Sequence, residues 1–169
     1  MNKNLTVNNL VKAAMLTALS IILSRFLGIQ ISETIKISFG GLPLMISGIL
    51  FGPLLGGLSG LASDLIGIMI NLQGAYHPGF TLGAILTGLM PGLIFKLGKG
   101  IDSKWLILLI VIFQFGINHG LLTPLWLNQL YGTPYSILLA GRAIKVIPDA
   151  IVHYILLYVI YDKVLPRIK

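Results

Sequence analysis

Four ionisable side chains lie inside an apolar stretch near the C-terminus, LLAGRAIKVIPDAIVHYILLYVI (138–160). They are Arg142, Lys145, Asp149 and His153, spaced three, four and four residues apart. This spacing places all four near one face of an α-helix. Ionisable groups inside a membrane span are costly and are usually functional. The stretch therefore predicts a helix that contributes charges to a binding site.

The composition indicates an integral membrane protein. The chain has 169 residues, of which 56% are hydrophobic and 10% are charged, with a mean hydropathy of +0.92. Soluble domains carry about 25% charged residues. The net charge is +7, but there is no clustered Lys/Arg stripe of the kind that binds nucleic acid. The chain has no cysteine, which excludes disulfides and thiolate metal sites, and we expect no cofactor and no metal.

The apolar segments predict an all-α membrane protein with six transmembrane helices and short loops, forming a single domain over 1–169. The second segment is the weakest candidate, because it is short and contains Pro43 near its start. The first apolar run lacks a small-residue cleavage site, so we interpret it as a retained span. The six helices are expected at roughly 8–27, 37–51, 54–72, 80–97, 104–127 and 135–163.

The positions of the basic residues predict the orientation of these helices. With six spans and a cytoplasmic N-terminus, Lys36 is the one basic residue in the outside connections. If the second segment did not cross, the basic run KLGKGIDSK (96–104) would lie outside, against the positive-inside rule. Both termini are therefore expected in the cytoplasm. The inside segments then hold Lys3, Lys12, Lys96, Lys99, Lys104, Lys163, Arg167 and Lys169.

Two connections have recognisable local patterns. The run IKISF (35–39) alternates apolar and polar residues, which favours a short extended piece. The run FGPLLGG (51–57) predicts a tight inside turn. In the last helix, Pro148 removes one backbone hydrogen bond and predicts a kink.

The orientation gives each polar residue inside a span a depth. The ionisable and amide side chains fall in the outer half of the spans or at the midplane, which predicts a cavity open to the outside and sealed within. Three basic residues and two acids are counted there, which suits an anionic or zwitterionic ligand. The candidates on the spans are Arg25, Asp64, Asn118, His119, Trp126, Arg142, Lys145 and Asp149.

Each of these residues also has a structural interpretation. Lys145 and Asp149 are well spaced for an internal ion pair. Asp64 has Ser59 and Ser63 nearby as possible hydrogen-bond partners. Asn118 and His119 have the alternative role of interhelical ties. His153 lies deeper than the others, and we interpret it as a packed or hydrogen-bonded core residue outside the site.

Small residues form two rows near the cytoplasmic ends of helices. Ala14 and Ala18 are one turn apart in the first helix. Such spacing lets another helix approach closely, although internal packing produces the same pattern. Gly52, Gly56 and Gly60 form a second row at the start of the third helix. Together the two rows predict a docking surface for another membrane protein.

Known catalytic motifs are missing from the sequence. There is no Gly-x-x-x-x-Gly-Lys-Ser/Thr phosphate loop, no His-Glu-x-x-His and no Gly-x-Ser-x-Gly. We therefore expect no catalytic residue and no enzymatic activity in this chain. A function driven by ATP would need a partner.

Three runs carry a resemblance to a known family. They are AMLTALSIILSRF (14–26), FGPLLGGLSGLASDLIG (51–67) and GAYHPGFTL (74–82). In a small chain of six predicted helices, they resemble the S-component of energy-coupling-factor (ECF) vitamin transporters, and the third run resembles the folate-specific members. The resemblance covers nearly the whole chain.

The resemblance implies a membrane protein of the prokaryotic cell membrane that captures folate from outside. It implies docking through Ala14 and Ala18 onto a membrane coupling protein, which sits on two cytoplasmic ATPase subunits. It also implies that the connections after the first and third helices gate the pocket. The gating residues of the second of these connections are Gly74, Ala75, Tyr76, His77 and Pro78.

The chemistry of folate is compatible with the candidate residues. Its glutamate tail carries two carboxylates, for which Arg25, Arg142 and Lys145 are suitable partners. The pterin edge suits a carboxylate, from either Asp64 or Asp149, and Asn118 or His119 can satisfy its other edges. Flat rings stack on aromatic side chains, and the candidates for this role are Tyr76, Phe80, Trp126 and Tyr131.

Other functions remain open on the sequence alone. An S-component for pantothenate, riboflavin or thiamine is the nearest alternative, although cationic thiamine fits poorly with three basic residues in the spans. A stand-alone secondary transporter or channel is a second alternative, but no inverted repeat is evident. A purely structural assembly subunit is a third, and it would bind no small molecule.

Overall fold

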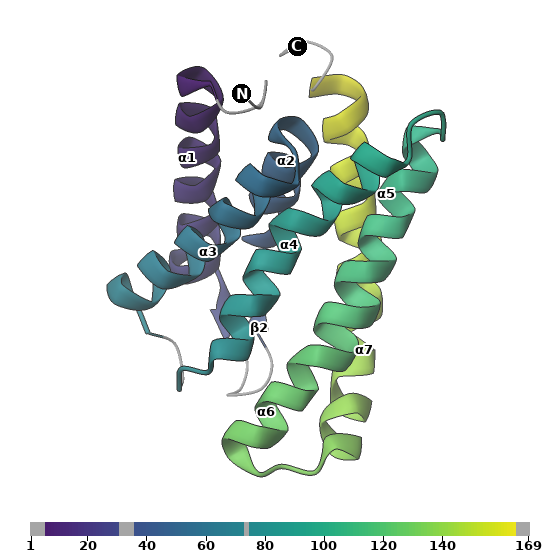
Figure 1. The fold of residues 1–169 in the computed structure, drawn as a ribbon. Helices are drawn as coiled ribbons and strands as arrows, with labels where there is room; N and C mark the ends of the chain where they lie inside the picture. Colours follow the sequence, from purple (N-terminus) through teal and green to yellow (C-terminus); the bar gives the residue numbers. More distant parts are fainter. Residues whose placement is uncertain (1–5, 31–35, 73–74, 165–169) are drawn as a thin grey trace.

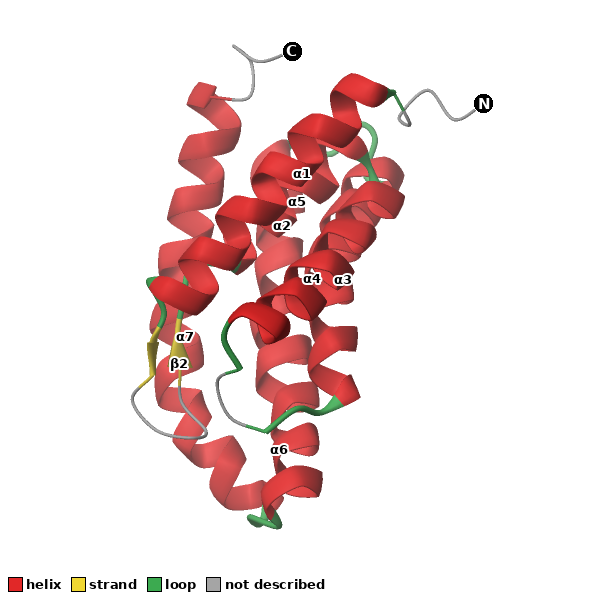
Figure 2. Cartoon of the chain, turned by 90° about the vertical axis from the view of Figure 1, so that its left-hand side faces the viewer, coloured by secondary structure: helices red, strands yellow, loops and turns green. Residues whose placement is uncertain are grey.

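The computed structural model describes residues 6–30, 36–72 and 75–164, and this part of the chain is almost entirely helical (Figure 1). The first described helix begins, and the last described helix ends, on the same side of the molecule (Figures 1 and 2). The elements in chain order are α1 (Val7–Ile21), η1 (Ile22–Phe26), β1 (Ile29–Gln30), β2 (Lys36–Ile37), α2 (Gly41–Phe51), α3 (Pro53–Ile70), α4 (Pro78–Leu97), α5 (Ser103–Val111), η2 (Ile112–Leu122), α6 (Thr123–Tyr131), α7 (Tyr135–Val159) and η3 (Ile160–Val164).

Several helices are long and apolar enough to cross a membrane. Four qualify: α1 with η1, α3, α4, and the continuous rod from Ser103 to Tyr131. A fifth is α7 with η3, if its two arms are taken as one bent span. The structure differs from the prediction at the second span, where the helix α2 has only 11 residues. It begins at Gly41 rather than at 37, since Lys36 and Ile37 pair with β1 in an antiparallel ladder. This ladder is the extended piece expected within IKISF.

Glycine and proline mark two changes of direction in the chain. Gly52 separates α2 from α3 with φ 89°, a conformation that favours glycine, and Pro53 starts α3. This is the predicted tight turn. The axis of α7 bends by 46° between Ala143 and Lys145. Pro148 lies four residues beyond the bend, where its ring opposes the carbonyl of residue 144.

Helices α2, α3 and α4 pack at backbone contact through glycine. A β-carbon at Gly88 would overlap the carbonyl oxygen of Gly56, and one at Gly56 would overlap that of Gly88. Gly60 meets the backbone of Ala84 in the same way. The prediction that Gly52, Gly56 and Gly60 form a docking face is therefore wrong. Gly56 and Gly60 are buried against α4, so this row holds the protein's own helices together.

The remaining helices form the second half of the bundle, in which α5, η2 and α6 run as one rod beside α7 (Figures 1 and 2). A buried apolar cluster joins this half to α2. Its members are Leu42, Met45, Ile107, Ile110, Val111, Phe115 and Leu157.

The glycine contact makes a testable prediction. Gly88→Ala should destabilise the protein by about 3 kcal/mol or more, because the new β-carbon meets backbone that no rotamer change can move. The thermal unfolding midpoint in detergent measures this. Gly141→Ala in α7 is the matched control, since nothing lies within 4 Å of its β-carbon position. A midpoint for Gly88→Ala equal to that of Gly141→Ala would contradict the packing argument.

Candidate binding site

A cavity of about 340 Å³ lies between the two halves of the bundle. Its volume is near the lower end of the range for sites that enclose a drug-sized ligand, roughly 300–1,000 Å³. All ten residues predicted to bind the ligand line it, although they come from seven different elements and connections. They are Arg25, Asp64, Tyr76, Phe80, Asn118, His119, Trp126, Arg142, Lys145 and Asp149.

The apolar core closes one end of this cavity. Met45 and Phe115 belong both to the cavity lining and to the buried cluster of the second half. His153 lies beside them, with its ring 4.7 Å from that of Phe115 and 5.6 Å from that of Phe39. Its Nδ1 donates to the carbonyl of Asp149 at 2.8 Å. His153 is thus a packed and hydrogen-bonded residue, as expected, but it also lines the cavity from which the sequence interpretation excluded it.

Arg25 and Asp64 form an ion pair at the wall of the cavity. Nη2 of Arg25 lies 3.1 Å from Oδ1 of Asp64, and each side chain is 12% exposed. The second carboxylate oxygen of Asp64 accepts from the hydroxyl of Thr81 at 2.7 Å. The suggested partners Ser63 and Ser59 bond elsewhere, to Ser20 and Ser47 respectively. Asp64 therefore ties α1, α3 and α4 together.

A network of uncharged polar groups joins α4 to η2. Gln114 donates through Nε2 to the hydroxyl of Thr87 at 2.8 Å and to Nε2 of His119 at 3.1 Å. Asn118 donates to the carbonyl of Gly83 at 2.9 Å. Since an amide NH₂ only donates, Nε2 of His119 accepts, and the proton of the neutral ring is on Nδ1. Asn118 is thus an interhelical tie, whereas the bond of the His119 side chain to Gln114 stays within η2; both residues face the cavity.

The π-helical turn of η2 makes this network possible. In an α-helix, residues five apart point about 140° away from each other. In η2 the backbone bonds run from i to i+5, which brings Gln114 and His119 to the same side. Thr123 likewise donates to the carbonyl of Asn118, five residues earlier, at 2.8 Å. Insertions of this kind are frequent at functional sites.

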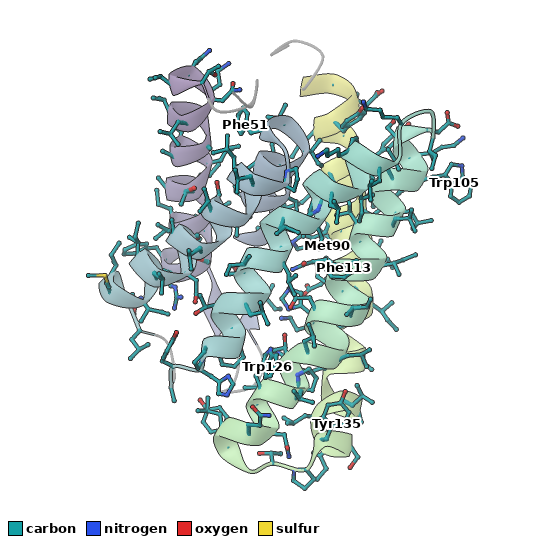
Figure 3. The ribbon with its side chains drawn as sticks, in the orientation of Figure 1. Phe51, Met90, Trp105, Phe113, Trp126 and Tyr135 are labelled. Atoms are coloured by element: carbon teal, nitrogen blue, oxygen red, sulfur yellow. The ribbon has the colours of Figure 1, made fainter. Side chains whose placement is uncertain are left out.

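Trp126 lies at the other end of the cavity from the apolar core. Figure 3 places it far from Trp105, the only other tryptophan. The indole packs directly over Gly79, where a β-carbon would overlap the ring, and stacks on His77 with centroids 5.6 Å apart. Its Nε1 is buried and has no hydrogen-bond partner among the described residues. A buried N–H of this kind is suited to a ligand acceptor.

The charged residues of α7 stay close to one another. Nζ of Lys145 lies 3.4 Å from Oδ2 of Asp149, the i, i+4 pair considered from the sequence. Nη1 of Arg142 lies 3.5 Å from the carbonyl of His119 on η2. Among the described residues of the lining, α7 contributes two basic groups and one acid, while Arg25 and Asp64 form an ion pair of their own. The local charge excess of +1 suits an anionic ligand.

The structure adds lining residues that the sequence interpretation missed. Gln114 is the clearest, since a lone amide inside the apolar run ILLIVIFQFGI is itself a signal of an interhelical contact. Small hydroxyl residues carry no comparable signal, because they are common in membrane helices. Those that line the cavity include Ser20, Ser24, Ser63, Thr81 and Thr87.

The predicted gating residues fall into three groups. Ala75 and Tyr76 line the cavity, and the hydroxyl of Tyr76 lies 3.3 Å from that of Thr81. His77 caps α4 by accepting from the backbone N–H of Gly79, and Pro78 is the first residue of that helix. Gly74 lies outside the described residues.

A second, apolar groove runs along α1 and α3. Its volume is about 580 Å³, and none of the described residues lines both the groove and the cavity. Ala14 and Ala18 line it and are exposed, as a docking surface requires. Larger apolar residues flank them, among them Leu10, Ile21, Ile22, Leu55, Leu58 and Ile66.

These features define a class of protein: a multi-pass membrane protein with a polar cavity inside the bundle and an apolar groove outside it. Residues 8–161 match the family model described as "ECF transporter, substrate-specific component", and the chain belongs to this family. Two known proteins are similar to this chain over most of their length. "Folate transporter FolT" of Clostridium novyi (strain NT) is 37% identical over 152 residues, covering 90% of this chain and 87% of that protein.

A solved structure extends the comparison to the fold. The crystal structure of FolT bound with folic acid matches with a TM-score of 0.82 at 26% identity, covering 92% of this chain and 93% of that one. The helices are therefore arranged as in a protein that was solved with folic acid bound.

The network between α4 and η2 makes a second prediction. Gln114→Leu should destabilise the protein by about 1–3 kcal/mol, because Thr87 and His119 each lose a buried hydrogen bond. The thermal unfolding midpoint in detergent is the measurement. Gln129→Leu, at an exposed position on α6, is the control and should leave the midpoint nearly unchanged. Equal midpoints for the two variants would show that the network contributes little.

Proposed function

We propose that this chain is the high-affinity folate-binding subunit of an ATP-driven ECF importer in a prokaryotic cell membrane. The observation that carries the proposal is the cavity, in which basic groups, amides and aromatic rings meet inside a fold that matches folate-bound FolT. Membership in the family and the identity to a folate transporter support it. Pantothenate, riboflavin and thiamine carriers are less well supported, as is a stand-alone transporter.

The glutamate tail of folate would bind to α7. Arg142 and Lys145 face the cavity from successive turns, and each can donate to a carboxylate. Arg25 was also a candidate for this clamp, but its guanidinium is held by Asp64. The pterin would meet the uncharged groups of η2 and α6, where Asn118, His119 and Trp126 line the cavity.

The acid that contacts the pterin would be Asp149 rather than Asp64. Both oxygens of Asp64 already accept hydrogen bonds from Arg25 and Thr81. A carboxylate of the tail competes with Asp149 for Lys145, and its binding would free Asp149 to accept from the pterin. Tyr76, Phe80 and Tyr131 surround the same space and can stack on the rings.

Six crossings with both termini in the cytoplasm remain our proposal for the topology. α2 is too short to span alone, but strand β2 and residues 38–39 precede it, and Gly40 already has helical backbone angles. Together they cover roughly 30 Å, the thickness of a bilayer core, at about 3.3 Å per extended and 1.5 Å per helical residue. The positive-inside rule then places Lys96, Lys99 and Lys104 in the cytoplasm.

The energy for transport would come from partners. We propose that the groove between α1 and α3 docks onto a membrane coupling protein that carries two cytoplasmic ATPases. The small side chains of Ala14 and Ala18 let a partner helix approach closely, and the lining is almost wholly apolar.

Ligand binding by the purified chain tests the proposed substrate. Folate should bind without nucleotide and quench the fluorescence of Trp126, a signal that Trp126→Phe removes and Trp105→Phe keeps. Arg142→Ala and Lys145→Ala should each weaken folate binding about 100-fold, because a buried carboxylate loses its counter-charge. The loss should be much smaller for pteroic acid, which lacks the glutamate.

Lys99→Ala, at the far end of the bundle, is the matched control for the loss of a positive charge. Folate affinity in both α7 variants equal to that of Lys99→Ala would exclude the clamp. No binding of folate by the wild-type chain would overturn the substrate itself.

A second experiment tests docking. Ala14→Trp combined with Ala18→Trp should leave folate affinity unchanged and abolish uptake by the assembled transporter, because two indoles fill the groove. Met15→Trp is the control, since Met15 is exposed on α1 but does not line the groove. Uptake by the double variant at the rate of Met15→Trp would place the docking surface elsewhere.

A further inference from the structure

We infer that Arg25 and Asp64 are positioning residues that hold the wall of the cavity in place and thereby set how long a ligand stays bound. This inference rests on the proposed function as a ligand-capturing subunit. It assigns Arg25 a different role from the carboxylate clamp expected from its charge. We call the linked residues Arg25, Asp64, Asn71 and Thr81 the latch.

The first observation is the position of Asp64 between two helices. Its carboxylate accepts from Arg25, at the end of η1, and from Thr81, in the first turn of α4, at 3.1 and 2.7 Å. The hydroxyl of Thr81 also lies 3.3 Å from that of Tyr76. One carboxylate on α3 thus bonds to η1 and to α4, and through Thr81 it is linked to Tyr76 in the segment before α4.

The second observation is a reciprocal contact between Arg25 and Asn71. Nη1 of Arg25 donates to the carbonyl of Asn71 at 3.3 Å, and Nδ2 of Asn71 donates to the carbonyl of Arg25 at 3.1 Å. Asn71 is the residue at which α3 ends. The two chain segments that leave α1 and α3 on this side are therefore tied at their starting points.

The third observation is the room made for the arginine. A β-carbon at Gly67 would lie 2.7 Å from Nε of Arg25. The guanidinium crosses the face of α3 only because this residue is glycine. Since the obstructing atom belongs to a flexible side chain, Gly67→Ala should displace the guanidinium without a large loss of stability.

The placement of the latch links it to the ligand. Arg25, Asp64 and Tyr76 all line the cavity, so the bonds between them fix one wall. Both charges are 88% shielded from solvent, where an ion pair is weakly screened and its loss leaves an uncompensated charge. When the latch breaks, the outer ends of α1, α3 and α4 can separate, and the bound ligand escapes faster.

Dissociation rates of two ligands test this role. Stopped-flow tryptophan fluorescence measures the release of folate and of pteroic acid from wild-type protein, Asp64→Asn and Gly67→Ala. Both variants should release both ligands about tenfold faster, which corresponds to the loss of one charge-assisted hydrogen bond. The factor should be the same for the two ligands, because the latch does not touch the glutamate. Gly141→Ala should release them at the wild-type rate.

Two results would overturn the inference. One is a release rate unchanged in both variants. The other is acceleration confined to folate, which would place Arg25 on the ligand's tail. If the wild-type chain binds neither ligand, the proposed substrate fails, and hydrogen exchange of the ligand-free protein still tests the latch. Residues 22–27 and 67–72 should then exchange faster in both latch variants than in Gly141→Ala, and equal exchange would reject it.

Discussion

The backbone contact between α3 and α4 is the constraint on which the rest of the structure depends. Gly56 and Gly88 have no side chain between them, so the two helices meet as closely as helices can. Gly48 on α2 joins them by the same means. A bilayer offers no hydrophobic force between helices, and close packing of this kind takes its place. The compact group of α2, α3 and α4 then provides a firm wall, against which the second half of the bundle encloses the cavity.

The second half uses polar contacts where the first uses glycine. In the π-helical segment η2, Gln114 and Asn118 bond to Thr87 and Gly83 of α4 and join the two halves, while His119 accepts a bond from Gln114. Polar groups inside a membrane must find partners within the protein. The same groups that satisfy this need also face the cavity, so the network stabilises the fold and supplies atoms that can recognise a ligand.

The charged residues that line the cavity differ in where their partners lie. Arg25 is neutralised by an acid on another helix and so contributes to the architecture. Among the described residues, Arg142, Lys145 and Asp149 line the cavity from one helix with two positive charges and one negative charge, a balance that suits an anion. In the part of the chain that the structure describes, no residue lines both the cavity and the apolar groove of α1 and α3. Ligand capture and partner docking can therefore occupy separate surfaces of one small protein.

The sequence by itself determined that the chain is a membrane protein, most helix positions, the turn at Gly52 and ten of the residues that line the cavity. Composition and helical periodicity suffice for this, because they fix which residues lie in the membrane and which face of a helix each one occupies. The tertiary structure decided which side chains meet. In the folded bundle Arg25 pairs with Asp64, Gly56 and Gly60 pack against α4, and Gln114 and His153 line the cavity. Periodicity describes one helix at a time, whereas these outcomes depend on which helix lies opposite and, in η2, on a turn that the pattern does not reveal.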